Sequence, residues 1–159
     1  MKIIKKSLQL SYQLFPAQYS PESGRRPYHF AFIFKRGVLV SFGVNSYHKC
    51  PKILRLARRF NIRKYTEYQY PHAETDAISK AWGKIHLDNT CLMTIIRLNR
   101  YGKLQDSKPC VDCRAILDSI GLDKIWWSTK DGKVTNGRIS ILVEDLGEVS
   151  GKKQFKEKT

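Results

Sequence analysis

Two short motifs constrain the fold of this chain more than any other feature. His72-Ala73-Glu74 lies near the middle of the chain, and Pro109-Cys110-Val111-Asp112-Cys113 follows further along. A histidine and two cysteines supply three corners of a tetrahedral zinc site and leave the fourth to water, which is typical of catalytic rather than structural zinc. The fold must therefore bring two distant segments to one point.

Both motifs are predicted at the start of a helix. Proline is favoured in the first helical turn, so Pro109 predicts a helix over 109–120. The positive end of its dipole would stabilise thiolates, and the spacing of Cys110 and Cys113 places both sulfurs on one face. A second helix is predicted over 71–85, where mostly small residues recur at every fourth position; these are Ala73, Ala77, Ala81 and Ile85.

The remaining pattern predicts an α/β fold, a three-layer α/β/α sandwich around a five-stranded mixed sheet. Segment 130–137 is too short for a helical crossover, so strand five should run antiparallel to strand four. We expect one domain over residues 1–151. The other predicted elements are helices over 3–15 and 52–60 and strands over 28–34, 38–44, 91–98, 124–129 and 138–143.

Positive charge is the second strong feature. The chain has 29 Lys and Arg against 14 Asp and Glu, a formal net charge of +15. Segment 46–71 holds seven of the basic residues and one acidic residue, and segment 152–159 holds four and one. Such a field attracts polyanions, so single-stranded nucleic acid or a nucleotide is the expected partner. Segment 152–159 is expected to be a disordered basic tail.

Composition also narrows the cellular setting. The chain has no apolar run long enough to cross a membrane, and polar residues interrupt the apolar stretch after the first lysines. We therefore expect a cytoplasmic protein without a membrane partner, and a homo-oligomer stays open. A Cys-x-x-Cys pair without a secretion signal favours metal or redox chemistry over disulfides. A thioredoxin-like redox pair would leave His72 and Glu74 unexplained.

The chain resembles the cytidine deaminase superfamily over roughly residues 28–147. A hairpin ending in Phe42-Gly43-Val44-Asn45 precedes the two motifs in the family's order. The resemblance implies one zinc ion on His72, Cys110 and Cys113 and an activated water whose proton Glu74 passes to the ring nitrogen and then to the leaving amine. A purely structural zinc site, with Glu74 as a helix-start carboxylate, is the alternative.

The resemblance also bears on the base. It implies that Asn45 contacts the substrate, although Asn45 could simply end a strand. With an antiparallel last strand, the chain resembles the free-nucleoside deaminases and the bacterial toxin deaminases that attack DNA, and it differs from the tRNA adenosine deaminases. Cytosine is therefore favoured over adenine. Ser46 and Tyr47 follow Asn45 where nucleoside-specific members often have an acidic residue, which weakens the case for a free ribose.

Segment 46–71 joins Asn45 to His72, so we expect it at the mouth of the site. Its basic residues alternate with tyrosines, as in proteins that hold single strands by charge and stacking. The alternative is a solvated helix whose Ile53, Leu56 and Phe60 cover the sheet. A second metal site at His48 and Cys50 stays open. The candidate substrate contacts are Asn45, Ala73, Tyr47, Tyr70, Arg55, Arg59, Arg63 and Ser107.

Three functional hypotheses result. The first is a zinc-dependent hydrolase that converts cytosine to uracil in single-stranded DNA or RNA, the chemistry used in base editing. The second is a deaminase of free (deoxy)cytidine or (deoxy)cytidylate. The third is a catalytically silent zinc domain that binds nucleic acid.

Overall fold

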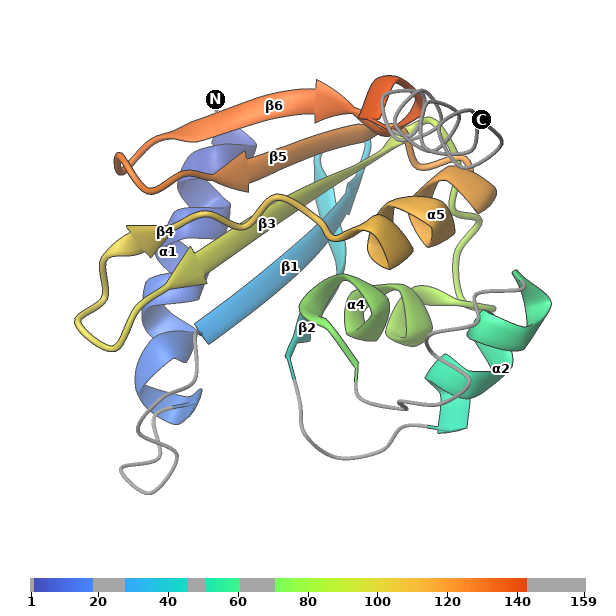
Figure 1. Cartoon of the computed structure of the whole chain (residues 1–159), viewed down its shortest axis with the longest axis horizontal. Helices are drawn as coiled ribbons and strands as arrows, with labels where there is room; N and C mark the ends of the chain where they lie inside the picture. Colours follow the sequence, from blue (N-terminus) through green and yellow to red (C-terminus); the bar gives the residue numbers. More distant parts are fainter. Residues whose placement is uncertain (1, 19–27, 46–50, 61–70, 143–159) are drawn as a thin grey trace, which may run out of the picture.

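The computed structural model describes residues 2–18, 28–45, 51–60 and 71–142, and Figure 1 shows their arrangement. The strands form one mixed sheet in the order β2-β1-β3-β5-β6, in which only β3 and β5 run parallel among the described pairs. The strands are β1 (Tyr28–Lys35), β2 (Val38–Val44), β3 (Cys91–Leu98), β4 (Leu104–Gln105), β5 (Lys124–Ser128) and β6 (Val134–Arg138). The helices are α1 (Lys2–Gln18), α2 (Pro51–Arg59), α4 (Ala73–Ala81) and α5 (Val111–Ser119).

The sheet separates two apolar layers, because alternate residues of a strand face opposite sides. Phe30, Phe32 and Phe34 of β1 pack against α1, while Ala31 and Ile33 face α4 and α5. In Figure 1, α1 accordingly lies behind the sheet, with α4 and α5 in front of it. The predicted three-layer α/β/α sandwich is confirmed.

The sheet has six strands rather than the predicted five, because the short β4 pairs with the end of β3. The last strand runs antiparallel to β5, as predicted, but its predicted bounds of 138–143 are wrong. Pairing begins at Val134, directly after the turn, and stops where Asp123 accepts hydrogen bonds from the backbone N–H groups of Ile139 and Ser140. Residues 139–142 are helical.

The predicted helices exist, with shifted ends. Helix α1 continues through Pro16 to Gln18 instead of ending before Pro16. Helix α4 ends at Ala81 instead of Ile85, because Trp82 is extended and Gly83 takes a φ of 78°. The predicted basic tail, residues 152–159, lies outside the described residues.

Helix α4 is held tightly on β2. A Cβ atom on Gly43 would lie 2.2 Å from the carbonyl oxygen of Ala73 and 2.3 Å from the backbone nitrogen of Ala77, so only glycine allows this approach. The Asp76 carboxylate accepts a hydrogen bond from the Val44 N–H at 3.0 Å, and Ser41 Oγ donates to the Ala77 carbonyl at 2.8 Å. These contacts place the start of α4 beside the end of β2.

Helix α2 covers α4. Its predicted apolar face is confirmed, since Ile53, Leu56 and Ala57 are buried, but that face packs on α4 instead of covering the sheet. The cationic side chains of α2 therefore remain at the surface. No helix in the described part of the chain is long and apolar enough to cross a membrane.

Candidate zinc site

The structure brings His72, Cys110 and Cys113 together at the adjacent N-termini of α4 and α5. His72 is the N-cap residue of α4, and Cys110 is the N-cap residue of α5, so both motifs lie at helix N-termini as predicted. The predicted start at Pro109 is wrong, because α5 begins at Val111 and Pro109 precedes its N-cap. The His72 Nδ1 atom lies 3.5 Å from Cys110 Sγ and 3.4 Å from Cys113 Sγ. All three donor atoms lie within 4.8 Å of one another.

This spacing fits a zinc ion. Tetrahedral zinc, with a nitrogen at about 2.0 Å and a sulfur at about 2.3 Å, would hold those two atoms about 3.5 Å apart. Among the described residues the group contains three donors, and no fourth His, Cys, Asp or Glu from that part of the chain joins it. Three protein ligands favour a site that keeps one open position over a structural zinc site.

The surroundings of Cys110 favour the ionised thiolate, which can bind a cation. Hydrogen bonding with Cys113, together with His72 beside it, lowers the pKa of Cys110 from 9.0 to about 3. The N-terminus of α5 adds the positive end of a helix dipole. Cys110 is therefore a thiolate at neutral pH, which is the form that binds zinc.

Glu74 stands beside the ligands with an unusual carboxyl group. Its side chain is 1% exposed, and burial raises its pKa from 4.5 to about 7. Within the described residues, its Oε2 atom has no hydrogen-bond partner. A carboxyl group with a pKa near neutrality can both accept and return a proton, which suits a general acid–base.

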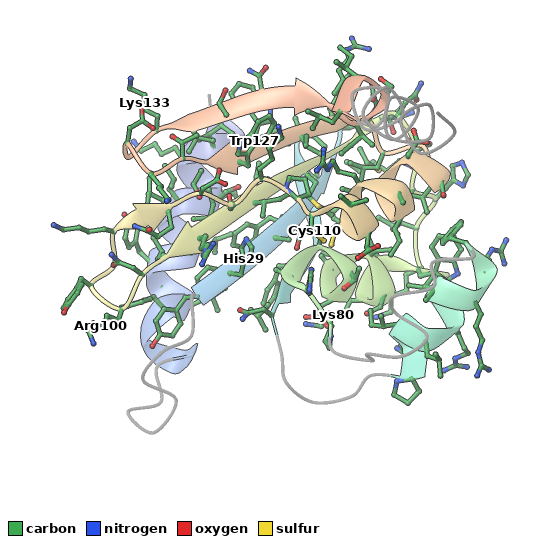
Figure 2. The ribbon with its side chains drawn as sticks, in the orientation of Figure 1. His29, Lys80, Arg100, Cys110, Trp127 and Lys133 are labelled. Atoms are coloured by element: carbon green, nitrogen blue, oxygen red, sulfur yellow. The ribbon has the colours of Figure 1, made fainter. Side chains whose placement is uncertain are left out.

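His29 is a site residue that the sequence analysis missed. It lies on β1, and its ring interacts electrostatically with His72 and Cys110; Figure 2 labels His29 and Cys110. Burial, followed by the nearby Arg97 guanidinium, lowers the pKa of His29 from 6.5 to about 4. Its Nε2 atom is buried without a hydrogen-bond partner among the described residues. A lone histidine in a strand carries no local motif that could have revealed this position.

Asn45 lies next to His29. Its side-chain oxygen accepts a hydrogen bond from the His29 N–H at 3.1 Å, and its own N–H donates to the His29 carbonyl at 3.3 Å. The side-chain nitrogen of Asn45 donates no hydrogen bond within the described part of the chain. Asn45 therefore both ends β2 and keeps a donor for a ligand.

The other predicted substrate contacts do not lie together in one site. Ala73 is fully buried at the start of α4. Ser107 is also buried, and its hydroxyl bonds to the Ile95 carbonyl and Ser128 Oγ, which joins β3 to β5. Arg55 and Arg59 line a pocket beside the C-terminal half of α4. Tyr47, Tyr70, Arg63, His48 and Cys50 lie outside the described residues.

Comparison with solved structures finds cytidine deaminases. Cytidine deaminase from Burkholderia pseudomallei is 14% identical, with a TM-score of 0.58 over 87% of this chain and 94% of that chain. Cytidine deaminase from Mycobacterium leprae is 18% identical, with a TM-score of 0.51 over 87% and 95%. A dCMP deaminase from the cyanophage S-TIM5 is 16% identical, with a TM-score of 0.49 over 79% and 82%.

Comparison by sequence with family models and with curated proteins finds no match. At these identities the structural likeness establishes the fold, and the ligand group supplies the separate chemical evidence. The chain has the cytidine deaminase fold, so the predicted resemblance is confirmed at the level of the fold.

Proposed function

We propose that this protein is a zinc-dependent hydrolase that deaminates cytosine in free (deoxy)cytidine or (deoxy)cytidylate. One observation carries the proposal: three zinc-type donors lie within 4.8 Å of one another, and the carboxylate of Glu74 is buried beside them. Neither a structural zinc site nor a redox pair requires a buried carboxyl group whose pKa is near 7.

Metal binding and proton transfer are assigned to different residues. His72, Cys110 and Cys113 would hold the zinc ion, which when bound supplies Lewis acidity and a water of lowered pKa. Glu74 accepts one proton from the attacking water and donates it to the ring nitrogen of the base; it then takes the remaining proton of the added hydroxyl and supplies it to the departing amine. Ammonia leaves and a carbonyl replaces the amine, so cytosine plus water gives uracil plus ammonia.

Three observations support cytosine as the base or a small molecule as its carrier. The antiparallel β5–β6 pair is the arrangement that the resemblance associates with cytosine rather than tRNA adenosine deaminases. The Burkholderia and Mycobacterium structures with this fold are both cytidine deaminases. The side-chain N–H group of Asn45 donates to no other described residue and is available to bind the sugar or the base.

The test is a substrate panel. Purified zinc-loaded protein is incubated with cytidine, deoxycytidine, CMP, dCMP and a single-stranded cytosine oligonucleotide, and uracil products are quantified by chromatography. We expect saturable turnover of at least one free substrate, abolished in Glu74→Gln. Turnover of none of the five by protein with stoichiometric zinc would reject the proposal.

A cytosine deaminase acting on single-stranded nucleic acid is the second candidate, and the net charge of +15 favours it. Conversion of the oligonucleotide without turnover of any free substrate would select this candidate. Because phosphate contacts release counterions, that activity should also fall steeply with salt concentration, whereas turnover of a nucleoside should not.

A further inference from the structure

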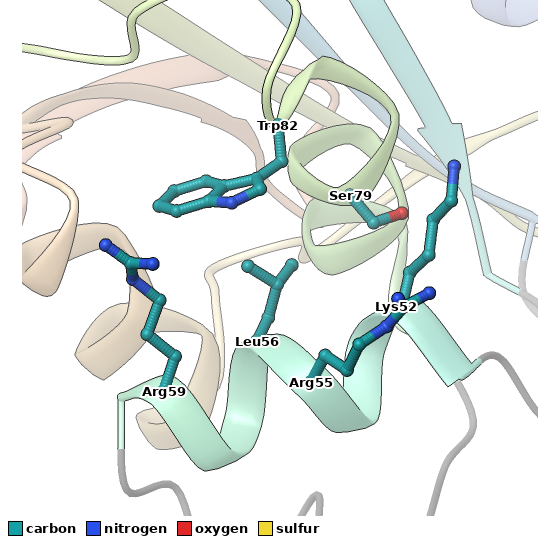
Figure 3. A pocket seen from close by; sticks show the side chains of 6 residues that line it. All are labelled: Lys52, Arg55, Leu56, Arg59, Ser79 and Trp82. Atoms are coloured by element: carbon teal, nitrogen blue, oxygen red, sulfur yellow. The ribbon is translucent and has the colours of Figure 1, made fainter.

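A depression lies at the far end of α4 from the candidate zinc ligands. Its volume is about 450 Å³, and Figure 3 shows its lining: Lys52, Arg55, Leu56 and Arg59 rise from α2 toward Ser79 of α4 and its C-cap residue, Trp82. A helix rises about 1.5 Å per residue, so His72 and Trp82, which flank α4, lie roughly 15 Å apart along its axis. This depression is therefore separate from the candidate zinc site.

Among the described residues, the cations of this depression have no acidic partner. Within the described residues, no carboxylate forms an ion pair with Lys52, Arg55 or Arg59, and none lines the depression. Helix α2 itself contains no acidic residue. Three like charges on one face repel one another unless an anion joins them, so the depression is suited to phosphate groups.

Trp82 gives the depression an aromatic surface. The indole is 37% exposed, and the Arg59 guanidinium lies over it, 5.4 Å from the ring centroid. Phe60 supports it edge-on, with ring centroids 5.7 Å apart. A planar base can stack on such an indole or guanidinium surface, which adds attraction that does not depend on sequence.

A second hollow of about 510 Å³ continues past the same pair, since Arg59 and Trp82 line both. Its other walls include Ile85, Leu87 and Ile120, so it is less charged than the first. Together they form one groove that is cationic at one end, aromatic in the middle and apolar at the other. This order suits a strand with phosphates and stacked bases better than a single phosphate ion.

We propose that this α2–α4 groove binds single-stranded nucleic acid, with Lys52, Arg55 and Arg59 contacting phosphates and Trp82 stacking on a base. The groove is a binding surface distinct from the zinc site, and the proposal does not depend on which substrate that site deaminates.

The test measures binding of a fluorescein-labelled thymidine-only 20-mer by anisotropy. Without cytosine this strand cannot be deaminated, so the result is independent of the proposed reaction. The variant Lys52→Gln/Arg55→Gln/Arg59→Gln is compared with Lys2→Gln/Lys5→Gln/Lys6→Gln, which removes the same charge from exposed positions of α1 across the sheet. Zinc content and thermal midpoint confirm that both variants are folded.

We expect the groove variant to weaken binding at least tenfold and the α1 variant to weaken it less than threefold. Each lost phosphate contact should lower the slope of log K against log salt by about 0.7, so the groove variant should lose up to about 2. Trp82→Ala should weaken binding more than Trp82→Phe, which keeps a ring.

Three outcomes would overturn the proposal. Equal weakening by the two triple variants would mean that only net charge matters. Failure of the wild-type protein to bind the 20-mer would show that the groove is not a site for single-stranded nucleic acid. Displacement of the 20-mer by dTMP at the same phosphate concentration would instead assign the groove to a free nucleotide.

Discussion

The two ends of α4 differ in almost every physical respect. At the N-terminal end, Glu74 is 1% exposed and the ligand atoms of His72 and two cysteines converge within 4.8 Å. At the C-terminal end, Trp82 is 37% exposed beside three cations that have no acidic partner among the described residues. The first end is closed and fixed by many contacts, and the second is open to solvent.

The difference indicates two kinds of recognition on one helix. Chemistry on a small group needs a buried site in which charge is not screened by water, which the N-terminal end provides. Attraction of a polyanion needs accessible charge that can exchange its counterions, which the C-terminal end provides. Substitutions at the first end should therefore have large effects, and substitutions at the second should have small effects on stability.

Removing a metal ligand should have the largest effect. Cys113→Ser replaces a fully buried ligand, so we expect loss of stoichiometric zinc, turnover at background and a lowered thermal midpoint. Metal analysis and calorimetry on the same sample measure these changes. Cys91→Ser, at a buried cysteine outside the ligand group, is the control and should keep zinc. Full zinc occupancy in Cys113→Ser would contradict the assigned ligand set.

Replacing Glu74, the proposed proton carrier, should have the second-largest effect. Glu74→Gln keeps size and burial but cannot carry a proton, so we expect kcat to fall by about 10²- to 10⁴-fold. Zinc content should stay at one per chain, which separates this variant from the ligand variants. A Glu74→Gln protein with wild-type turnover would show that the buried carboxylate has no part in proton transfer.

The packing of α4 on β2 should be the next most sensitive feature. Gly43→Ala places a Cβ atom 2.2 Å from the Ala73 carbonyl oxygen, and overpacking of this kind costs about 3 kcal/mol. The free energy of unfolding in urea measures it. Gly137→Ala is a matched control, because its Cβ would meet the Trp127 side chain at 3.0 Å rather than backbone. Equal losses in both variants would argue against a special role for the α4 contact.

His29 should make stability depend on pH near the closed end. Its pKa is lowered from 6.5 to about 4, so between these values the unfolded chain binds more protons than the folded protein. Stability is therefore retained above pH 6.5 and is lost as pH falls toward 4, by up to about 1.4 kcal/mol per pH unit. Urea unfolding at pH 7, 6 and 5 should show a shallower loss in His29→Gln. Parallel pH curves for the two proteins would contradict the assignment.

Substitutions at the solvent-exposed C-terminal end of α4 should change the free energy of unfolding least. Arg59→Gln removes the guanidinium over Trp82, a contact worth about 0.5–1 kcal/mol at an exposed site. Arg58→Gln, at an exposed position in the same last turn, should change the free energy of unfolding less. A loss of several kcal/mol in Arg59→Gln would mean that the groove is a structural element rather than an open surface.

Local patterns explain why much of the fold could be predicted. The place of both motifs at helix N-termini and the antiparallel last strand follow from residue type, periodicity and loop length, which act within a few residues. The end of β6 could not be predicted in this way. It depends on Asp123 accepting hydrogen bonds from Ile139 and Ser140, a contact between separate elements.

The sequence by itself determined the candidate ligand types, the candidate acid–base carboxylate and the positive charge, because these are properties of the residues and their local spacing. Only the tertiary structure decided which residues share a site. It brought His29 of β1 beside the zinc ligands, and it turned Arg55 and Arg59 toward Trp82 instead of the N-terminal end of α4. The physical reason is that packing of the apolar face of α2 on α4 fixes where its charged face points, and this packing is set by contacts distant in sequence.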